Sequence, residues 1–116
     1  MKLSRIEIIT SLSKFNELKA ALSKVGVMGM TVMQVLGCGV QKGAPEHARE
    51  EYEEMELRPK QLITIITTED LTKKIIEIVK QELYTGHIGD GKIFVSEISN
   101  VIRVRTGEEG LEALRR

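Results

Sequence analysis

The chain has 116 residues, a length typical of one domain, and its 17 lysines and arginines balance 17 aspartates and glutamates. A formal charge of zero provides no broad basic field, so neither nucleic acid nor an anionic membrane is an expected partner. No apolar run approaches a membrane span and no signal peptide follows Met1, which predicts a cytoplasmic protein without direct membrane insertion. The single cysteine, Cys38, excludes an intrachain disulfide.

The first part of the chain predicts a strand, a helix and a second strand. Residues 3–9 are rich in Ile and predict the first strand, and residues 31–36 are β-branched and partly alternating. Between them, Ser13 is a suitable cap for a helix that reaches Val25, because apolar residues recur there at helical spacing. Gly26 stands where a helix C-terminus favours glycine.

A long irregular segment follows at residues 37–59. It begins with the turn-rich run 37–43 and continues with an acidic run that ends at Arg58. Connections of this length are usually functional or disordered. A charged surface helix is the alternative, since Pro45 suits a first helical position. The two interpretations are compatible if the segment becomes helical on a partner.

The second part of the chain repeats the pattern of the first. The pattern predicts a buried strand at 60–67, a helix capped by Thr67 or Thr68, a strand at 92–97, a short fifth strand at 101–105 and a last helical turn at 108–114. Strand-helix-strand used twice predicts an α+β, ferredoxin-like fold in one domain spanning 1–116, with an antiparallel sheet and both helices on one face. Another subunit is expected to cover the opposite face. A doubly wound parallel sheet is the alternative, for which the chain is short.

The glycine-rich stretch 85–95 is the first candidate for a phosphate site. Three glycines and Lys92 between a helix and a strand suit a loop whose backbone N–H groups hold an anion. The stretch nearly matches a P-loop, but Ile93 replaces the hydroxyl residue that holds Mg²⁺, and the order helix-loop-strand is reversed. The structural alternative is a tight helix-to-strand turn.

Arg103 and Arg105 are the second candidate for phosphate binding. Residues two apart on a strand point to the same side, and guanidinium groups bind phosphate in bidentate geometry. The alternative is that the two arginines pair with acidic surface residues, an interaction of small energy. The run 37–39, Gly-Cys-Gly, is a third candidate for backbone contact, or a simple exit from a strand.

No catalytic or metal-binding constellation is visible in the sequence. His47 and His87 lack partners at metal-ligand spacing, and Cys38 has no evident base. We therefore expect a protein that holds a nucleotide without transforming it, not an enzyme. A weak ATPase using the same pocket is one alternative. An RNA-binding domain is another, disfavoured because such domains stack bases on aromatic residues, which make up 3% of this chain. A trimeric metal-tolerance protein of similar fold is a third, disfavoured because no ligand cluster is visible.

Three stretches together resemble the PII signal-transduction family. Residues 85–95 resemble the family's B-loop and residues 102–108 its C-loop. The run 37–43 resembles the start of the family's T-loop, and Pro59-Lys60 its end. The resemblance covers essentially the whole chain.

This resemblance implies a ferredoxin-like homotrimer with ATP or ADP bound in clefts between subunits. By similarity, three glycines and three cations hold the phosphates, namely Gly39, Gly89, Gly91, Lys92, Arg103 and Arg105. Thr31 and the backbone at Gly37 and Cys38 lie near adenine. The nucleotide-binding set is then Thr31, Gly37, Cys38, Gly39, Gly89, Asp90, Gly91, Lys92, Arg103 and Arg105.

The resemblance also implies an effector and a switch. Gln41 would help hold Mg²⁺ of MgATP, through which 2-oxoglutarate binds, and Lys60 would pair with a carboxylate of that effector. Ligand state would set the shape of the long loop, which docks on a partner such as an ammonium or other transporter or a nitrogen-metabolism enzyme. Such bias requires that the ligand bind one loop state more tightly.

The sequence also departs from the family pattern. In many members a tyrosine of the loop is uridylylated, and here that position is Glu53, with Tyr52 as its neighbour and the candidate for modification. Val40 and His87 stand where basic residues are common, which lowers the charge near the nucleotide. An adenylate sensor without a 2-oxoglutarate response is therefore the alternative function.

Overall fold

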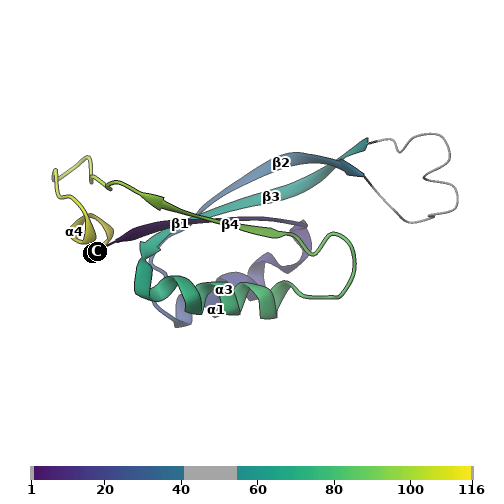
Figure 1. The fold of residues 1–116 in the computed structure, drawn as a ribbon, viewed down its shortest axis with the longest axis horizontal. Coiled ribbons are helices and arrows are strands. Elements are labelled where there is room, and N and C mark those ends of the chain that lie inside the picture. Colours follow the sequence, from purple (N-terminus) through teal and green to yellow (C-terminus); the bar gives the residue numbers. More distant parts are fainter. Residues whose placement is uncertain (1, 41–54, 116) are drawn as a thin grey trace, which may run out of the picture.

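The computed structural model describes residues 2–40 and 55–115 (Figure 1). In chain order, the elements are strand β1 (Leu3–Thr10), a 3-10 turn η1 (Leu12–Lys14), helix α1 (Phe15–Lys24), strands β2 (Thr31–Val40) and β3 (Met55–Thr68), helix α3 (Glu69–Leu83), strand β4 (Lys92–Ile98) and helix α4 (Leu111–Leu114). The described residues form a four-stranded antiparallel sheet in the order β2-β3-β1-β4. This arrangement is the predicted α+β fold, with the two central strands supplied by different halves of the chain.

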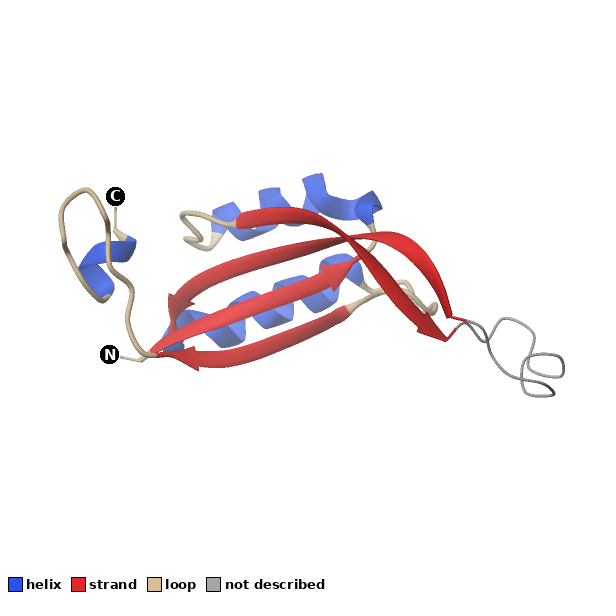
Figure 2. Ribbon diagram, turned by 90° about the horizontal axis from the view of Figure 1, so that it is seen from above, coloured by secondary structure: helices blue, strands red, loops and turns tan. Residues whose placement is uncertain are grey.

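Both long helices cover the same face of the sheet (Figure 2). Alternate residues of β1 and β3 point toward them, and α1 and α3 contribute the residues at helical spacing that the sequence predicted. The core consists of Ile6, Ile8, Leu18, Leu22, Ile63, Ile65, Ile75, Val79 and Leu83. The side chains are aliphatic, as the low aromatic content requires.

The opposite face of the sheet carries apolar side chains without cover from the described residues. Met33 is 51% exposed on β2, and Phe94 is 49% exposed on β4. On β3, between these strands, Leu62 and Ile66 alternate with the buried core residues and remain half-buried. A sheet face of this kind is the surface for which the sequence predicted cover by another subunit.

The second strand is longer than the sequence predicted. Residues 37–39, expected as a turn or strand exit, belong to β2, where Gly37 is opposite Arg58 and Gly39 is opposite Glu56. The prediction failed because glycine favours turns locally, whereas here the backbone is paired with a strand about twenty positions away. β2 and β3 therefore form a two-stranded arm that extends beyond β1 (Figure 1).

The predicted fifth strand at 101–105 is also wrong. Only an isolated bridge between Ile102 and Glu109 forms there, followed by turns. The backbone bonds close within the segment, from Arg103 N–H to Glu108 C=O and from Gly107 N–H to Arg103 C=O. Alternation of apolar and polar residues therefore produced a hairpin-like loop, because no neighbouring strand lies beside it.

The predicted helix boundaries are confirmed at one site and displaced at another. Thr68 precedes α3 in an extended conformation, with Glu69 and Asp70 in the first turn, where negative charge is favourable. Ser13, expected as the first cap, lies inside η1, and α1 starts at Phe15. Gly26 follows α1 with φ of 102°, as its predicted place at the helix end requires.

Candidate functional site

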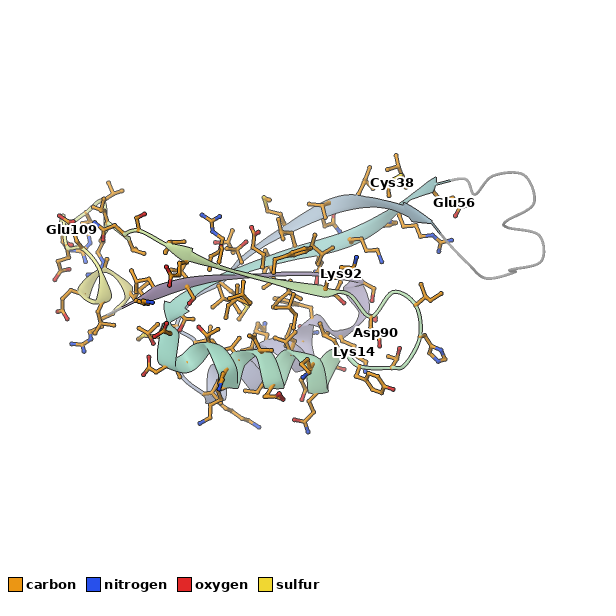
Figure 3. All side chains as sticks on the ribbon, viewed as in Figure 1. Lys14, Cys38, Glu56, Asp90, Lys92 and Glu109 are labelled. Carbon is orange, nitrogen blue, oxygen red and sulfur yellow. The ribbon has the colours of Figure 1, made fainter. Side chains whose placement is uncertain are left out.

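The predicted nucleotide residues occupy two opposite ends of the molecule (Figures 1 and 3). The end at the arm carries Gly37, Cys38, Gly39, Lys60, Gly89, Asp90, Gly91 and Lys92, and the opposite end carries Arg103 and Arg105. Thr31 lies between the two ends, opposite Thr64 in the ladder. The two groups are linked by β4, which runs from Lys92 to Ile98. Six steps along a strand cover about 20 Å, which is more than a triphosphate can bridge. One chain therefore holds two half-sites, which we call the loop half-site and the arginine half-site.

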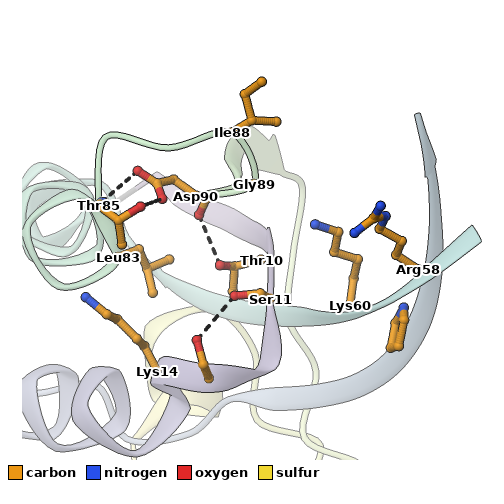
Figure 4. A pocket seen from close by; sticks show the side chains of 12 residues that line it. Thr10, Ser11, Lys14, Arg58, Lys60, Leu83, Thr85, Ile88, Gly89 and Asp90 are labelled. Carbon is orange, nitrogen blue, oxygen red and sulfur yellow. Dashed lines mark hydrogen bonds between the residues drawn. The ribbon is translucent and has the colours of Figure 1, made fainter. Parts of the chain in front are cut away.

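The loop half-site is organised by the carboxylate of Asp90 (Figure 4). This carboxylate accepts hydrogen bonds from the Thr85 N–H at 2.7 Å, from the Thr85 hydroxyl and from the Gly86 N–H at 2.9 Å. The backbone C=O of Asp90 accepts a further bond, at 3.0 Å, from the hydroxyl of Thr10 on β1. The Thr85 hydroxyl, followed by the Thr85 and Gly86 backbone donors, holds the pKa of the Asp90 carboxyl below its usual 3.8.

The Asp90 side chain therefore forms hydrogen bonds within its own loop in this structure. Its carboxylate closes the turn 85–90, and the C=O bond ties the loop to the end of β1. Glycine is required at position 91 for a separate reason, because the residue has φ of 114° and a Cβ there would lie 2.4 Å from the Ile9 C=O oxygen. Gly89 also has positive φ, but open space surrounds it. The loop is thus held in shape by contacts within the chain. Close packing requires Gly91, whereas Gly89 faces open space.

A cavity of about 400 Å³ lies beside this loop, between η1 and the base of the arm. Lys60 and Arg58 line one side and Lys14 another, with the hydroxyls of Thr10 and Ser11 between them (Figure 4). Arg58 forms an ion pair with Glu56 at 2.9 Å. Lys14 and Lys60 form no ion pair with any residue in the described parts of the chain. The cavity can therefore accept a small anion.

Cys38 lies in the exposed part of the arm. It is opposite Leu57 in the ladder, and its thiol is free. The arm therefore places Cys38 as a strand residue with a backbone engaged in pairing. Its neighbours Gly37 and Gly39 share this arrangement, so these three residues are positioned by β3 and not by a turn.

The arginine half-site is built from the loop 101–110. The Arg103 guanidinium donates to the Glu108 carboxylate at 2.6 Å through Nη1, and its side chain is 24% exposed. Through Nη2 it donates to the C=O groups of Glu112, Ala113 and Arg115. Arg103 is thus held by its own chain on several sides.

Arg105 differs from Arg103. It lies in the exposed turn 104–106, just before Gly107, which has φ of 78°. Within the described ranges no carboxylate lies within ion-pair distance of it. The two arginines were predicted to be equivalent, whereas of the two only Arg105 has a guanidinium with no ion pair to the residues that the structure describes.

A second cavity, of about 570 Å³, belongs to the arginine half-site. Thr31 and Thr64, which are opposite each other in the ladder, line it together with Met30. Leu111 and Ala113 of the C-terminal segment form another wall. Apolar walls with a few hydroxyl and backbone groups suit a flat, largely apolar ligand group with a polar edge.

Sequence reasoning missed several of these contributors. Thr10 and Lys14 enter the loop half-site because β1 and η1 end there, and Ala113 enters the arginine half-site because the chain folds back after Gly110. The clearest available signal was Thr85, a hydroxyl residue five positions before Asp90 in a glycine-rich turn, since aspartate commonly accepts nearby backbone N–H groups.

Several predicted residues lie outside the described parts of the chain. These are Gln41, His47, Tyr52 and Glu53, and for Val40 only the backbone is described. Among the described residues no group of three or more His, Cys, Asp or Glu side chains is placed to hold a metal ion. No helix in those ranges is long and apolar enough to cross a membrane.

Comparison with known proteins identifies the family of this chain. The sequence model of the family described as nitrogen regulatory protein P-II matches residues 3–108. The nitrogen regulatory protein P-II of Bradyrhizobium diazoefficiens is 43% identical over 112 residues, covering 97% of this chain and all of that protein. A solved Bacillus subtilis GlnK–ATP complex superimposes with a TM-score of 0.82 at 40% identity, covering 97% of both chains. Citrate-bound Arabidopsis thaliana PII gives 0.78 at 32% identity, covering 99% of this chain and 92% of that one.

The fold and the two half-sites define a ferredoxin-like α+β protein with one cavity lined by cationic side chains and a second cavity with largely apolar walls. The chain belongs to the nitrogen regulatory protein P-II family. Its relatives carry the names of regulatory proteins and not of enzymes.

Proposed function

We propose that this protein is a signal-transduction regulator that binds ATP or ADP between copies of itself and controls a partner protein through residues 37–59. The observation that carries the proposal is the separation of the two half-sites, because Lys92 and Arg105 lie at opposite ends of one chain. A complete site then needs the loop half-site of one copy and the arginine half-site of another. The ATP-bound relative supports the choice of ligand.

A site shared in this way requires a head-to-tail contact, in which different surfaces meet. Such contacts close into rings when the rotation between copies is right. The proposed assembly is a homotrimer, and the open sheet face, with Met33, Leu62 and Phe94, is the apolar surface that it would bury. Burial of such side chains contributes about 25 cal/mol per Å².

Within the shared site, the phosphates would lie between the glycine loop and the arginine half-site. Gly39, Gly89 and Lys92 would contact them from one copy, and Arg105 from the other. The base would enter the cavity beside Thr31, where walls are apolar and hydroxyl groups reach its edge. Asp90 and Gly91 would act by shaping the loop, as their bonds within it indicate.

The cavity beside Lys60 would receive a small carboxylate effector. Its ammonium groups, which pair with no carboxylate among the described residues, favour a polycarboxylate such as 2-oxoglutarate bound together with MgATP, and a relative with bound citrate supports this class of ligand. The chain's own side of the Mg²⁺ site would be Gln41, which lies outside the described residues. No described residue cluster competes for that role.

Control of the partner would follow from the position of Lys60 at the root of the arm. An effector that holds Lys60 and Gln41 contacts both ends of the segment between them. It biases that segment only if it binds one of its conformations more tightly. The acidic composition of residues 44–58 suits a basic surface on the partner, either a transporter or an enzyme of nitrogen metabolism.

Complementation between two binding-deficient variants tests the proposal. Lys92→Gln disables the loop half-site and Arg105→Gln disables the arginine half-site, so each variant alone should bind ATP poorly in calorimetry. When equal amounts are refolded together, a random ring combines two intact halves at about one quarter of its sites. Recovery of that fraction at wild-type affinity supports the shared site. No recovery in mixed oligomers contradicts it.

Calorimetry with 2-oxoglutarate distinguishes a sensor of both nucleotide and 2-oxoglutarate from a sensor of nucleotide alone. Binding of 2-oxoglutarate only in the presence of MgATP would support a carbon and nitrogen sensor. ATP binding without any 2-oxoglutarate response would identify an adenylate sensor instead. Phosphate release at the rate of the uncatalysed reaction would support a regulator and argue against the weak ATPase.

A further inference from the structure

The guanidinium of Arg103 donates more hydrogen bonds to the C-terminal segment than to its own loop. Its Nη2 donates to C=O groups of three residues at the end of the chain, at 3.3 Å to Glu112 and 3.2 Å to Ala113, with Arg115 as the third. A guanidinium has five N–H donors, and Nη1 is already engaged by Glu108. Most of the directional donor capacity of Arg103 is therefore used within the chain.

The segment that Arg103 holds is short and only partly buried. Helix α4 has four residues, contains no buried residue and starts after Gly110, which turns the chain with φ of 64°. Two backbone bonds of this segment run from Ala113 N–H to Gly110 C=O at 3.0 Å and from Arg115 N–H to Glu112 C=O at 3.3 Å. A helix of one turn is not stable by itself, so its position depends on contacts such as those of Arg103.

The same segment forms a wall of the cavity beside Thr31. Leu111, Ala113 and Leu114 line that cavity opposite Thr64 and Met30. Movement of α4 would therefore open one side of the cavity. The guanidinium that holds α4 lies in the loop that also presents Arg105.

We propose that Arg103 is a positioning residue that fastens residues 111–115 as a wall of the base cavity, and that an anion bound to Arg103 competes with this contact. The proposal deepens the proposed function, because it assumes that the base of the nucleotide occupies that cavity. Arg105 then supplies the unengaged guanidinium for phosphate, and Arg103 links the phosphate part of the site to the base part.

Amide hydrogen exchange of the full chain without nucleotide tests the fastening directly. Arg103→Gln should raise the exchange rates of the Ala113 and Arg115 amides at least about tenfold, since bonds to a charged group are lost. Arg105→Gln is the matched control, and its rates should equal those of the wild type. Equal rates in all three proteins would overturn the proposal. Exchange of α3 amides in the same spectra shows whether a variant is still folded.

Binding of two ligand fragments tests the link between the two parts of the site. Inorganic tripolyphosphate represents the phosphates and adenosine represents the base. Arg103→Gln should weaken both fragments, whereas Arg105→Gln should weaken tripolyphosphate alone. Arg103→Lys keeps the positive charge but loses the N–H donors of the guanidinium. This variant should therefore retain much of the tripolyphosphate binding. Its Ala113 amide should still exchange faster than that of the wild type.

The outcomes separate this inference from the proposed function. If the wild type binds no nucleotide, the proposed function fails, and the exchange rates without ligand still decide whether Arg103 fastens the segment. If ATP binds and tripolyphosphate raises exchange at Ala113 and Arg115 in the wild type, competition for Arg103 is supported. If adenosine affinity is unchanged in Arg103→Gln, the wall does not serve the base and the proposal is overturned.

Discussion

The side chain of Lys60 crosses the backbone of Gly37 so closely that a Cβ at Gly37 would lie 2.9 Å from the Lys60 Cγ. The two residues are diagonal neighbours in the ladder, since Gly37 is opposite Arg58 and Lys60 is opposite Val35. The missing side chain at Gly37 lets Lys60 lean across β2 at the cavity beside the glycine-rich loop. Gly37, which the sequence pattern predicted to lie in a turn, therefore leaves the space in which the Lys60 side chain is oriented.

Substitution of Gly37 tests this relationship. Gly37→Ala should displace Lys60 and lower the free energy of unfolding by about 1–2 kcal/mol, because an overpacked site must shift its neighbours. Gly39→Ala is the matched control, since no atom lies within 4 Å of a Cβ built there. Urea unfolding at one protein concentration measures both. Equal losses in the two variants would show that the Lys60 contact has no effect on stability.

Alanine variants of Gly91 and Gly89 separate the stability cost of backbone strain from that of a steric clash. Both have positive φ, 114° and 105°, but only a Cβ at Gly91 would meet an atom, the Ile9 C=O oxygen at 2.4 Å. Each alanine variant should cost about 1–3 kcal/mol from the backbone conformation. Gly91→Ala should cost more, by at least about 1 kcal/mol. Denaturant unfolding of the pair measures the difference, and a smaller loss for Gly91→Ala would contradict the close packing of β4 on β1.

Much of the fold follows from sequence periodicity, and the exceptions have physical causes. β1, α3 and β4 were predicted because their apolar residues recur at strand or helix spacing and face one core. The run 37–39 was misassigned because its pairing partner is distant in sequence, and tertiary pairing overrides local preference. The run 101–105 alternates like a strand but has no strand beside it.

The residue types of the candidate site were predictable from the sequence, but their arrangement in space was not. The types of residue that hold anions could be recognised, yet their spacing along the chain does not show that Lys92 and Arg105 lie at opposite ends of the molecule. The spacing also does not show that Arg103, unlike Arg105, is hydrogen-bonded to the C-terminal segment, because this difference depends on where the chain folds after Gly110. These features are set by tertiary arrangement, which residue spacing alone does not encode.

The ionisation of Asp90 should control the shape of the glycine-rich loop at low pH. Its pKa is lowered in the folded state, so the stabilising bonds are complete above the unfolded pKa of about 3.9 and are lost as pH falls through the lower folded pKa. The backbone amide signals of Thr85 and Gly86 should therefore shift together below pH 3.8.

Asp90→Asn is the control for this titration. Its uncharged side chain has one carbonyl oxygen, which cannot replace both carboxylate oxygens in the bonds to Thr85 and Gly86. The variant should show the loosened loop at neutral pH and no further shift of these signals in the acidic range. A shift of equal size in the variant would assign the titration to another group.

Binding of a dicarboxylate should depend on the two lysines of the cavity to different extents. Lys60 lies at the root of the arm and leans over Gly37, whereas Lys14 lies on the short η1 turn across the cavity. Lys60→Gln should weaken 2-oxoglutarate binding in the presence of MgATP by about 10–100-fold, the effect of losing one charge-assisted hydrogen bond. Lys14→Gln, which removes the same charge from the opposite wall, should have a smaller effect. Calorimetry at constant ionic strength compares them, and equal losses would mean that the effector responds to the general field of the cavity and not to a contact with Lys60.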